Sequence, residues 1–571
     1  MVHAGLQTIR LLSDLVLASR SLFMEAELTD EIFEIILGKR NIDRANLPDF
    51  LNPKYDNQHD PFLLPDMDKA VKRLLRAHEG QEKITIYGDY DVDGVTSSAL
   101  LLDAFEKFGF ENVDFFLPNR FIDGYGISER AVEIIHQRGT DLIVTVDCGS
   151  LNHKEIELAN SLGLDVVVTD HHNIAESQPR AIAVVNPQRP ENRYPEANIF
   201  AGVGVAFKLV QALGAHLPGL ENGREKWLLD LVALGTVCDI VPMTGENRQN
   251  VYWGLEVLRK TRRPGIKAML AATSTENIST STLGFVLGPM INSAGRLETA
   301  EKALDLVFER DGLLALEKSN QLSALNKKRR DLQRKSLKKA IKLAENYKND
   351  PVLVIADTSF NEGVIGIIAS GLVDKFKKPV FVIGIEGEIA KGSARSFGDF
   401  SASQAVYSAE EVITKGGGHD AAAGVTLPTK KVDDFRKLVN NFYKSLNLKN
   451  QLAKLLPVPD MSLNDLSPLT FELYSKIQQL EPFGPGNEEP IFALKNLTVK
   501  HRQDMGDKKQ HIKYTFTDGE NEIKMIKFNA PNEFIFEPGE IVDVMFRIGL
   551  NEWRGRRTVE GMILHIRESD L

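Results

Sequence analysis

The chain has 571 residues, of which 43% are hydrophobic and 26% are charged, and its formal net charge is −10. This composition is ordinary for a soluble globular protein. The length exceeds the roughly 250–300 residues at which a single core stops growing, so two or more domains are expected. The negative charge does not indicate nucleic-acid binding, although a local basic groove matters more for phosphate contacts than the total.

Only two cysteines, Cys148 and Cys238, occur in this long chain. They argue against a secreted disulfide framework and predict a reducing, cytoplasmic environment. The apolar stretch Leu11–Leu17 surrounds Asp14, is too short for a membrane span and lacks a signal-peptide layout. We therefore expect no membrane association.

The first part of the chain predicts an accessory segment followed by an α/β domain. Residues 1–79 contain helical stretches near Asp30–Leu37 and Asp66–Ala77, with no indication of their function. Across residues 80–298, short β-rich runs alternate with helical stretches, which is typical of a parallel sheet built from βαβ units. Three of these runs are Lys83–Gly88, Asp141–Val146 and Leu164–Thr169.

Clusters of aspartate and histidine follow these runs. The clusters are Asp89–Gly94 (DYDVDG), Asp147–Gly149 (DCG), Asp170–His172 (DHH) and, further along, Cys238–Asp239. Ligands converge at the carboxyl ends of parallel strands, so the clusters can face one point. Hard oxygen ligands with one or two histidine nitrogens suit Mn²⁺ or Mg²⁺ better than zinc. The pattern predicts two divalent ions, which would activate a water for hydrolysis at phosphorus.

Each cluster taken alone has a structural explanation. Asp239 is more often a turn or helix cap, and adjacent histidines such as His171 and His172 are more often at the surface. The Asp89–Asp93 triplet also resembles the start of an EF-hand, but no Glu falls at the twelfth loop position. Four clusters at successive strand ends favour the metal site over separate coincidences.

The second half predicts a connecting helix, a second α/β lobe and a small barrel. A long charged helical pattern covers residues 299–348, and we interpret its Lys327–Arg330 and Lys338–Lys339 clusters as a solvated face rather than a DNA contact. Residues 349–450 form another α/β unit, and short alternating strands over residues 455–571 predict a small barrel.

Glycines and cations in these parts predict phosphate contacts. Gly416–His419 lets backbone N–H groups approach an anion, and Ser393–Ser396 adds an arginine fork and a hydroxyl donor. The barrel offers candidates for holding a single strand, each of them individually more typical of a solvated surface. These candidates are Arg502, Lys508, Lys509, Lys513, Trp553, Arg554, Arg556 and Arg557.

These motifs, in this order, resemble the RecJ family of bacterial single-strand-specific exonucleases. The sequence has DYDVDG, DCGS, DHH and GTVCDIVP, then INSAGR (Ile291–Arg296), SARS (Ser393–Ser396), GGGH (Gly416–His419) and EPFGPGN (Glu481–Asn487). DHH alone indicates only the wider DHH phosphoesterase superfamily, whereas INSAGR and EPFGPGN are narrower. The resemblance implies two α/β lobes, DHH and DHHA1, joined by a long helix, and a C-terminal OB-fold barrel.

The resemblance also implies an activity: 5′ to 3′ exonucleolytic hydrolysis of single-stranded DNA to nucleoside 5′-monophosphates, in DNA repair, recombination and mismatch repair. We expect catalytic roles for Asp91, Asp93, Asp147, His171, His172 and Asp239. The expected ligands of the two Mn²⁺ or Mg²⁺ ions are Asp89, Asp91, Asp93, Asp147, His171 and Asp239, with Asp147 as the bridge. Asp170 is expected to orient an imidazole. Nucleic-acid contacts carried over by resemblance are Arg120, Arg296, Ser393, Arg395, Gly417, Gly418 and His419.

Two other functions share some of these features. A DHH phosphodiesterase for oligoribonucleotides or cyclic dinucleotides has the same metal chemistry, but the barrel and INSAGR argue against it. A non-catalytic single-strand binder would have lost ligands, whereas every expected ligand is present. The resemblance further implies a monomer that works with single-strand binding protein and an unwinding helicase, although no residue indicates a docking site.

Overall fold

The computed structural model describes residues 27–569, except 222, 276, 449–456, 507–508, 532–533 and 554. The stretch Leu11–Leu17 and the candidates Lys508 and Arg554 therefore lie outside the described residues, as does the side chain of Trp553. The chain divides into two compact units, one containing Tyr55–Leu455 and the other the residues before and after that range. The segment expected as an N-terminal accessory part is thus divided between the two units at Lys54.

The first lobe of the larger unit is built on a five-stranded parallel sheet in the order β2-β1-β3-β4-β5. Its strands are β1 (Ile84–Tyr87), β2 (Val113–Phe116), β3 (Leu142–Val146), β4 (Asp165–Thr169) and β5 (Ala183–Val185). All neighbouring strands pair in parallel. β1 and β3 are buried along their whole length, as expected for strands covered on both faces.

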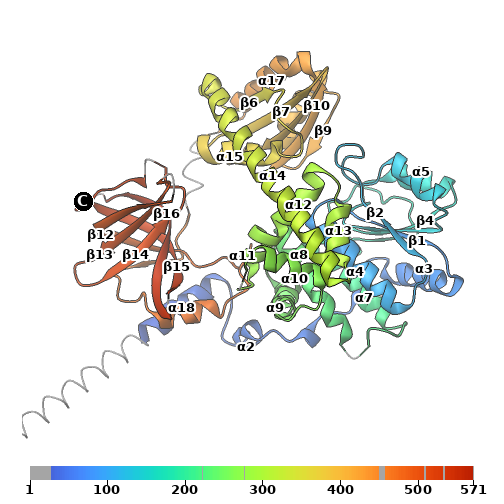
Figure 1. The fold of residues 1–571 in the computed structure, drawn as a ribbon, viewed down its shortest axis with the longest axis horizontal. Coiled ribbons are helices and arrows are strands. Elements are labelled where there is room, and N and C mark those ends of the chain that lie inside the picture. The colour runs from blue at the N-terminus through green and yellow to red at the C-terminus, as the bar shows by residue number, and fades with distance from the viewer. Residues whose placement is uncertain are drawn as a thin grey trace, which may run out of the picture. The chain divides into compact units, whose positions relative to one another are not determined.

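Helices cover both faces of this sheet (Figure 1). One face packs against α3 (Met67–Gly80), α4 (Val92–Phe108) and α7 (Gly202–Gly214), and the other against α5 (Glu129–Gln137) and α6 (His153–Ser161). The core of the first face continues into a group of helices that follows in the chain. They are α8 (Leu229–Cys238), α9 (Gly245–Arg259), α10 (Pro264–Ala272), α12 (Gly288–Leu297) and α13 (Glu301–Phe308).

A 33-residue helix, α14 (Gly312–Ala344), leads to the second lobe. The side chain of Asp311 caps it by accepting hydrogen bonds from the backbone of Leu313 and Leu314. The second lobe has a mixed sheet in the order β6-β7-β8-β10-β9. Its strands are β6 (Leu353–Asp357), β7 (Val380–Glu386), β8 (Ile389–Arg395), β9 (Lys415–Gly418) and β10 (Ala422–Pro428), and its helices are α15 (Ile365–Phe376), α16 (Ala402–Tyr407) and α17 (Val432–Ser445).

The smaller unit is a five-stranded barrel. Its strands are β12 (Phe492–Met505), β13 (His511–Thr517), β14 (Glu522–Lys527), β15 (Ile541–Trp553) and β16 (Arg556–Glu568). Pairing between β12 and β15 closes the sheet, and the short strand β11 (Met461–Leu463) adds to β12. Helical residues 27–39 and α18 (Phe471–Gln478) contribute to the same core. Two α/β lobes linked by a long helix, with a closed barrel, confirm the expected fold class.

None of the described helices combines the length and apolar character needed to cross a membrane.

Candidate metal centre and phosphate-binding residues

Three of the four motif clusters leave strands of the first sheet at the same edge. Asp89 and Asp91 follow β1, Asp147 follows β3, and His171 follows β4. The fourth cluster corrects the expectation of successive strand ends, because Asp239 follows the helix α8. That helix is apolar and almost entirely buried, and periodicity alone does not separate a short buried helix from a buried strand.

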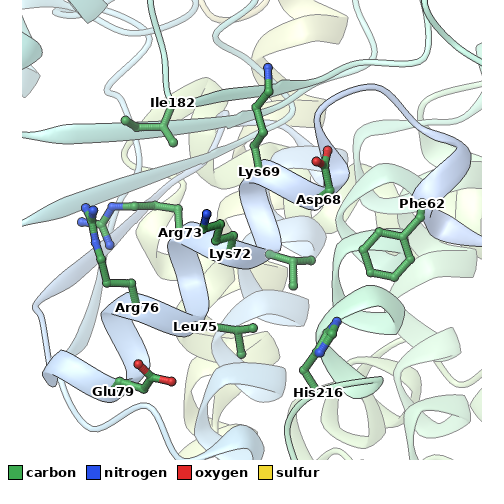
Figure 2. Close-up of a pocket in the computed structure, with 11 residues that line it drawn as sticks. Phe62, Asp68, Lys69, Lys72, Arg73, Leu75, Arg76, Glu79, Ile182 and His216 are labelled. Carbon is green, nitrogen blue, oxygen red and sulfur yellow. The ribbon is translucent and has the colours of Figure 1, made fainter.

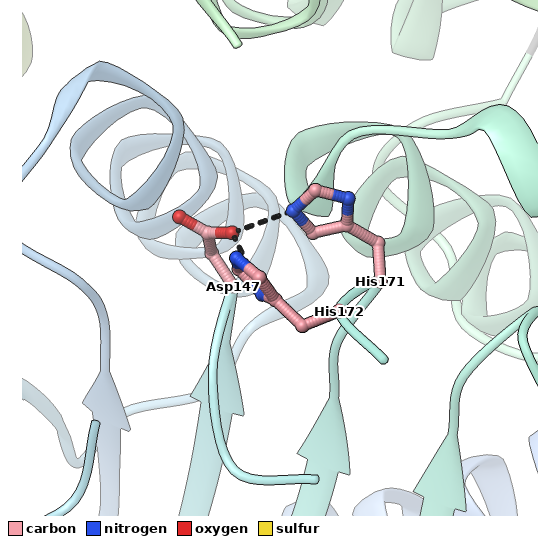
Figure 3. A group of neighbouring side chains, drawn as sticks. All are labelled: Asp147, His171 and His172. Carbon is pink, nitrogen blue, oxygen red and sulfur yellow. Dashed lines mark ion pairs between the residues drawn. The ribbon is translucent and has the colours of Figure 1, made fainter. Parts of the chain in front are cut away.

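The carboxylate oxygens and imidazole nitrogens of these clusters lie close together. His171 Nε2 lies 3.1 Å from Asp147 Oδ1, 3.7 Å from Asp239 Oδ2 and 3.9 Å from Asp93 Oδ2. Figure 3 shows Asp147 facing both histidine rings, with His172 Nδ1 at 3.9 Å from the same oxygen. Three groups each bring their ligand atoms within 4.8 Å of one another. The groups are Asp89–Asp91–Asp147, Asp93–His171–Asp239 and Asp147–His171–His172.

Local backbone structure fixes the carboxylates. The side chain of Asp91 caps α4 by accepting hydrogen bonds from the backbone of Asp93 and Gly94 at 2.9 and 3.2 Å. Asp93 accepts hydrogen bonds from Gly202 N at 2.6 Å and Val203 N at 2.9 Å, at the N-terminus of α7. That helix end favours a negative charge. Asp91 and Asp93 are thus both held by main-chain donors.

Asp147 occupies a strained position. Its φ of 61° lies in the left-handed region, which non-glycine residues seldom adopt. A Cβ atom at position 202 would lie 2.7 Å from the Cβ of Asp147, so only glycine allows α7 to approach this closely. Strain and close packing together hold the carboxylate at the centre of the cluster.

Asp170 supports the histidines instead of joining the ligand groups. Its Oδ1 accepts hydrogen bonds from the backbone of His171 at 2.7 Å and of His172 at 3.1 Å, and it lies 2.8 Å from His172 Nδ1. Its Oδ2 accepts a hydrogen bond from Ser150 N. The hydroxyl of Tyr125 contacts the His172 ring from the solvent side at 3.0 Å. The His172 ring is therefore held between a buried carboxylate and a phenol.

The cluster is electrostatically unfavourable without a cation. Burial, followed by the charges of neighbouring carboxylates, raises the pKa of Asp93 to about 7 and that of Asp239 to about 8. The same causes raise the pKa values of Asp89 and Asp147 well above their usual range. Burial lowers the pKa of His171 to about 4, so its imidazole is neutral and able to act as a ligand.

The donor set fits divalent metal ions. Asp89 Oδ1, Asp147 Oδ1 and His171 Nε2 are buried and have no hydrogen-bond partner within the part of the chain that the structure describes. Such groups are rare in folded proteins unless a ligand satisfies them. Carboxylate oxygens with one or two imidazole nitrogens suit Mn²⁺ and Mg²⁺, as expected from the sequence.

Arg120 and Arg296 lie close to this centre. The guanidinium of Arg120 stacks 4.1 Å above the ring of Tyr90, and its buried Nε has no hydrogen-bond partner among the described residues. Arg296, at the end of α12, donates a hydrogen bond from Nη1 to Gly363 O at 3.4 Å. A Cβ atom at position 363 would lie 1.8 Å from Arg296 O. This glycine therefore permits the close approach between the two lobes at Arg296.

Ser393 and Arg395 lie on β8 and face the start of α15. Arg395 Nη1 donates hydrogen bonds to Ser393 Oγ at 3.2 Å and to Ala394 O at 2.7 Å. A Cβ atom at position 366, in the first turn of α15, would lie 3.1 Å from both Arg395 Nη2 and Ser393 Oγ. Sequence reasoning missed this helix terminus, whose signal is the glycine pair Gly363 and Gly366. A helix N-terminus beside an arginine suits a phosphate.

Gly417, Gly418 and His419 lie at the end of β9 and in the turn to β10. Gly418 and Ala394 both align with Ala423 of β10, so this turn is two strands from Arg395. His419 N donates a hydrogen bond to Ala422 O at 2.8 Å, which closes the turn. The imidazole of His419 is exposed.

Several barrel cations have acidic partners. Arg502 pairs with Asp504 and Glu537, Lys513 with Glu560, and Arg557 with Glu552. These three cations are therefore ion-paired in this structure, and a role for them in holding a strand stays a prediction. The barrel also carries Phe528, which is 53% exposed and packs edge-on against His511. Sequence reasoning missed this ring, which lies in the turn that follows β14.

A separate cavity of about 790 Å³ lies against α3, as Figure 2 shows. Phe62, Leu75 and Ile182 supply apolar lining, and the cationic residues that line it are Lys69, Lys72, Arg73 and Arg76. Arg73 and Arg76 pair with Asp165, and Lys69 pairs with Asp66. None of the candidate site residues lines this cavity.

The fold and the aspartate–histidine centre define a DHH-type phosphoesterase. The model of the DHH family, N-terminal domain, matches residues 83–236, and the DHHA1 domain matches residues 331–445. The RecJ OB domain matches residues 460–565.

Similar proteins narrow the class. The chain is 36% identical over 536 residues to the single-stranded-DNA-specific exonuclease RecJ of Bacillus subtilis, covering 92% of this chain and 67% of the relative. It is 34% identical to the Escherichia coli protein of the same name, covering 88% of this chain and 90% of the relative. The chain belongs to the RecJ family of single-stranded-DNA-specific exonucleases.

Solved structures agree with this assignment. Thermus thermophilus RecJ in complex with Mn²⁺ superposes with a TM-score of 0.80 at 27% identity, covering 95% of this chain and 76% of that chain. The same protein in complex with Mg²⁺ gives a TM-score of 0.74 at 25% identity, covering 95% of this chain and 75% of that chain. The expected cofactors, Mn²⁺ or Mg²⁺, match the ions in these relatives.

Proposed function

We propose that this protein is a metal-dependent exonuclease that degrades single-stranded DNA from the 5′ end and releases nucleoside 5′-monophosphates. The observation that carries the proposal is the convergence of five carboxylates and two imidazoles, with three buried ligand atoms unsatisfied. Membership of the RecJ family supplies the substrate class. We further propose a role in DNA repair and recombination.

The ligand groups suggest how two ions would be held. Asp89 and Asp91 would hold one ion, and Asp93, His171 and Asp239 would hold the other. Asp147 belongs to groups on both sides and is the proposed bridge. Ions held there would supply an activated water for hydrolysis at phosphorus and would stabilise the charge that develops on the phosphate.

The remaining residues bind and orient the substrate. His172, whose pKa is raised to about 9 because the hydrogen bond and charge of Asp170 outweigh burial, presents a cation to the scissile phosphate. Arg120, which stacks on Tyr90, is proposed to contact the same phosphate. The exposed ring of Tyr125 beside His172 is available to stack on a base.

The second lobe is proposed to hold the strand end. Arg296, Ser393 and Arg395, with the first turn of α15, would bind the terminal phosphate, and Gly417, Gly418 and His419 would contact nearby nucleotides. Anchoring the terminal phosphate would place the first internucleotide phosphate at the metal centre. That register would account for release of single nucleotides from one end.

We propose that each part of the chain has a separate role. Residues 80–298 carry the metal centre, 299–348 connect the lobes, 349–450 hold the strand end, and 455–571 bind single-stranded DNA, while residues 1–79 remain accessory. A monomer acting in the cytoplasm, with single-strand binding protein and a helicase as partners, fits a DNA-processing role. An interlobe cleft too narrow for a duplex would account for single-strand selectivity, and a blunt duplex digested at the same rate would contradict it.

An end-labelling assay tests the activity. Single-stranded DNA labelled at the 5′ or the 3′ end is incubated with Mn²⁺ and wild type or Asp147→Asn. Asparagine keeps the size of the side chain and tolerates positive φ, so the variant removes mainly the charge. We expect wild type to release 5′-labelled mononucleotide at once and to shorten the 3′-labelled strand progressively. The variant should lose more than about 100-fold in kcat, since even residues that support metal ligands are worth 10–100-fold.

Asp141→Asn is the matched control, because Asp141 precedes β3 at the end opposite to Asp147. It should behave as wild type. Preferential cleavage of a competing dinucleotide by wild type would instead support the small-nucleotide phosphodiesterase. Equal activity of Asp147→Asn and wild type would contradict the proposed metal centre.

A further inference from the structure

Asn186 ends a further strand at the edge of the first sheet where the metal centre lies. It follows β5 directly, and β5 runs parallel to β4, so Asn186 lies at the same strand ends as Asp147 and the two histidines. Its side chain is fully buried, at 0% exposed, yet it belongs to none of the ligand groups found among the described residues. A buried amide needs hydrogen-bond partners, and those partners indicate what it holds in place.

Three hydrogen bonds engage the amide of Asn186. Its Nδ2 donates to His172 O at 2.9 Å and to Ser150 Oγ at 2.8 Å, and its Oδ1 accepts from Gln188 N at 2.8 Å. A main-chain carbonyl can only accept and a main-chain N–H can only donate, so His172 and Gln188 fix which way the amide faces. Both hydrogens of its NH₂ group are therefore directed at the loops that carry Asp147 and His172.

These bonds join two loops of the metal centre. Ser150 lies in the loop after β3, three residues from Asp147, and His172 lies in the loop after β4. A second bond links the same loops, because Ser150 N donates to Asp170 Oδ2 at 2.9 Å. Asp170 in turn accepts a hydrogen bond from His172 N at 3.1 Å, which closes the network. Asn186 and Ser150 are both fully buried, which keeps solvent from this side of the network.

We propose that Asn186 is a positioning residue of the metal centre, which holds the Asp147 carboxylate in place relative to the histidines. The inference rests on the proposed function and deepens it, because Asn186 acts through the ligand side chains and touches neither an ion nor the DNA. Asp147 Oδ1 and His171 Nε2 lie 3.1 Å apart on the two loops that Asn186 joins. A shift of either loop changes this separation, and the partners of metal ligands are typically worth about 10–100-fold in metal affinity or activity.

The experiment compares wild type, Asn186→Ala, Ser150→Ala and Asn160→Ala. Mn²⁺ binding is measured by titration calorimetry without DNA, and kcat and KM are measured on single-stranded DNA. Asn186→Ala should weaken Mn²⁺ binding by about 10–100-fold and lower kcat, with little change in KM, because the strand-end residues of the second lobe are untouched. Ser150→Ala removes one of the two acceptors and should weaken Mn²⁺ binding by about two- to tenfold, the worth of one hydrogen bond.

Asn160→Ala is the matched control, because Asn160 is an exposed asparagine of α6 whose Nδ2 also donates to a backbone carbonyl, Arg180 O, at 2.8 Å. This variant should bind Mn²⁺ as wild type does. A purely structural role for Asn186 would lower the melting temperature of the metal-free protein and leave the Mn²⁺ affinity of the folded protein unchanged. The melting temperature is therefore measured in parallel.

Wild-type Mn²⁺ affinity in Asn186→Ala, or an equal loss of affinity in Asn160→Ala, would overturn this inference alone. If Asn186→Ala does not fold, Ser150→Ala decides, and wild-type Mn²⁺ affinity in that variant would overturn the inference in the same way. Wild type that binds no Mn²⁺ and degrades no strand would overturn the proposed function as well.

Discussion

At the scale of single residues, Asp170 shows how a side chain outside the ligand groups can orient the histidines of the metal centre. Asp170 accepts three hydrogen bonds through one oxygen, two from the backbone of the histidine pair and one involving the His172 ring. Its other oxygen accepts from Ser150 N. A carboxylate satisfies all these donors, whereas an amide would turn its NH₂ group toward one of them.

Asp170→Asn is therefore expected to disturb the orientation of both histidines. We predict a 10–100-fold loss of kcat/KM and a higher Mn²⁺ concentration for half-maximal activity, as is typical of residues that support metal ligands. Glu133→Gln serves as the control, because Glu133 is an exposed carboxylate on α5 of the same lobe. A variant with wild-type kcat/KM and Mn²⁺ dependence would show that Asp170 does not position the histidines.

At the scale of elements, a buried ion network joins the helices that carry the centre to the start of α14. Arg263, just before α10, donates to Asp103 of α4 at 2.7 Å and to Asp230 of α8 at 2.8 Å. Arg310, next to the cap of α14, donates to Asp103 at 2.8 Å. Burial opposes ionisation of Asp103, but Arg263, Lys107 and Arg310 together hold the pKa of its carboxyl below the usual range.

Asp103→Asn should destabilise the larger unit by about 3–5 kcal/mol, the usual cost of breaking a buried pair. Because the pKa of Asp103 is lower in the folded protein, its contribution is fully present above the unfolded pKa of about 3.9 and declines as pH falls below it. The difference in unfolding free energy between wild type and variant should therefore narrow below about pH 4. Denaturant melts at several pH values measure it, and a difference that does not change with pH would contradict this assignment.

The sequence predicted those parts of the site that follow from the order of apolar runs and motifs along the chain. Asp89, Asp147 and His171 follow apolar runs at the ends of parallel strands, and that topology brings strand ends together whatever the distance along the chain. It did not predict that Asp239 ends a helix, or that Arg329 is buried within the otherwise exposed basic run Lys327–Arg330 of α14. Both depend on which neighbour packs against a helix, and residue pattern within the helix does not specify the neighbour.

At the scale of the whole molecule, alternating strand and helix patterns predicted the two lobes and the barrel. They did not predict that the N-terminal residues up to Lys54 belong to the same compact unit as the barrel. Ile32, Ile36 and Leu37 are almost fully buried in one core with strands that lie more than four hundred residues later in the chain. An apolar helix face indicates that the helix packs against another element, but it does not specify which element. The barrel is therefore completed by chain from both ends of the sequence.

Ile36→Asp should consequently destabilise the barrel unit, because it buries a charge in that core. We expect calorimetry to show a lower melting temperature for one transition, with the transition of the larger unit unchanged. Ile35→Asp is the matched control, since Ile35 is exposed on the same helical segment. Equal effects of the two variants would show that residues 27–54 do not stabilise the barrel.

The central claim is that Asp147 joins two divalent ions in one centre. The most direct measurement is Mn²⁺ binding by titration calorimetry, together with electron paramagnetic resonance, on wild type, Asp147→Asn and Asp141→Asn. We predict two ions per chain with a spin-coupled signal in wild type and Asp141→Asn. We predict loss of the coupling and of at least one ion in Asp147→Asn. A single ion in wild type, or two ions bound equally well with and without the Asp147 carboxylate, would contradict the account.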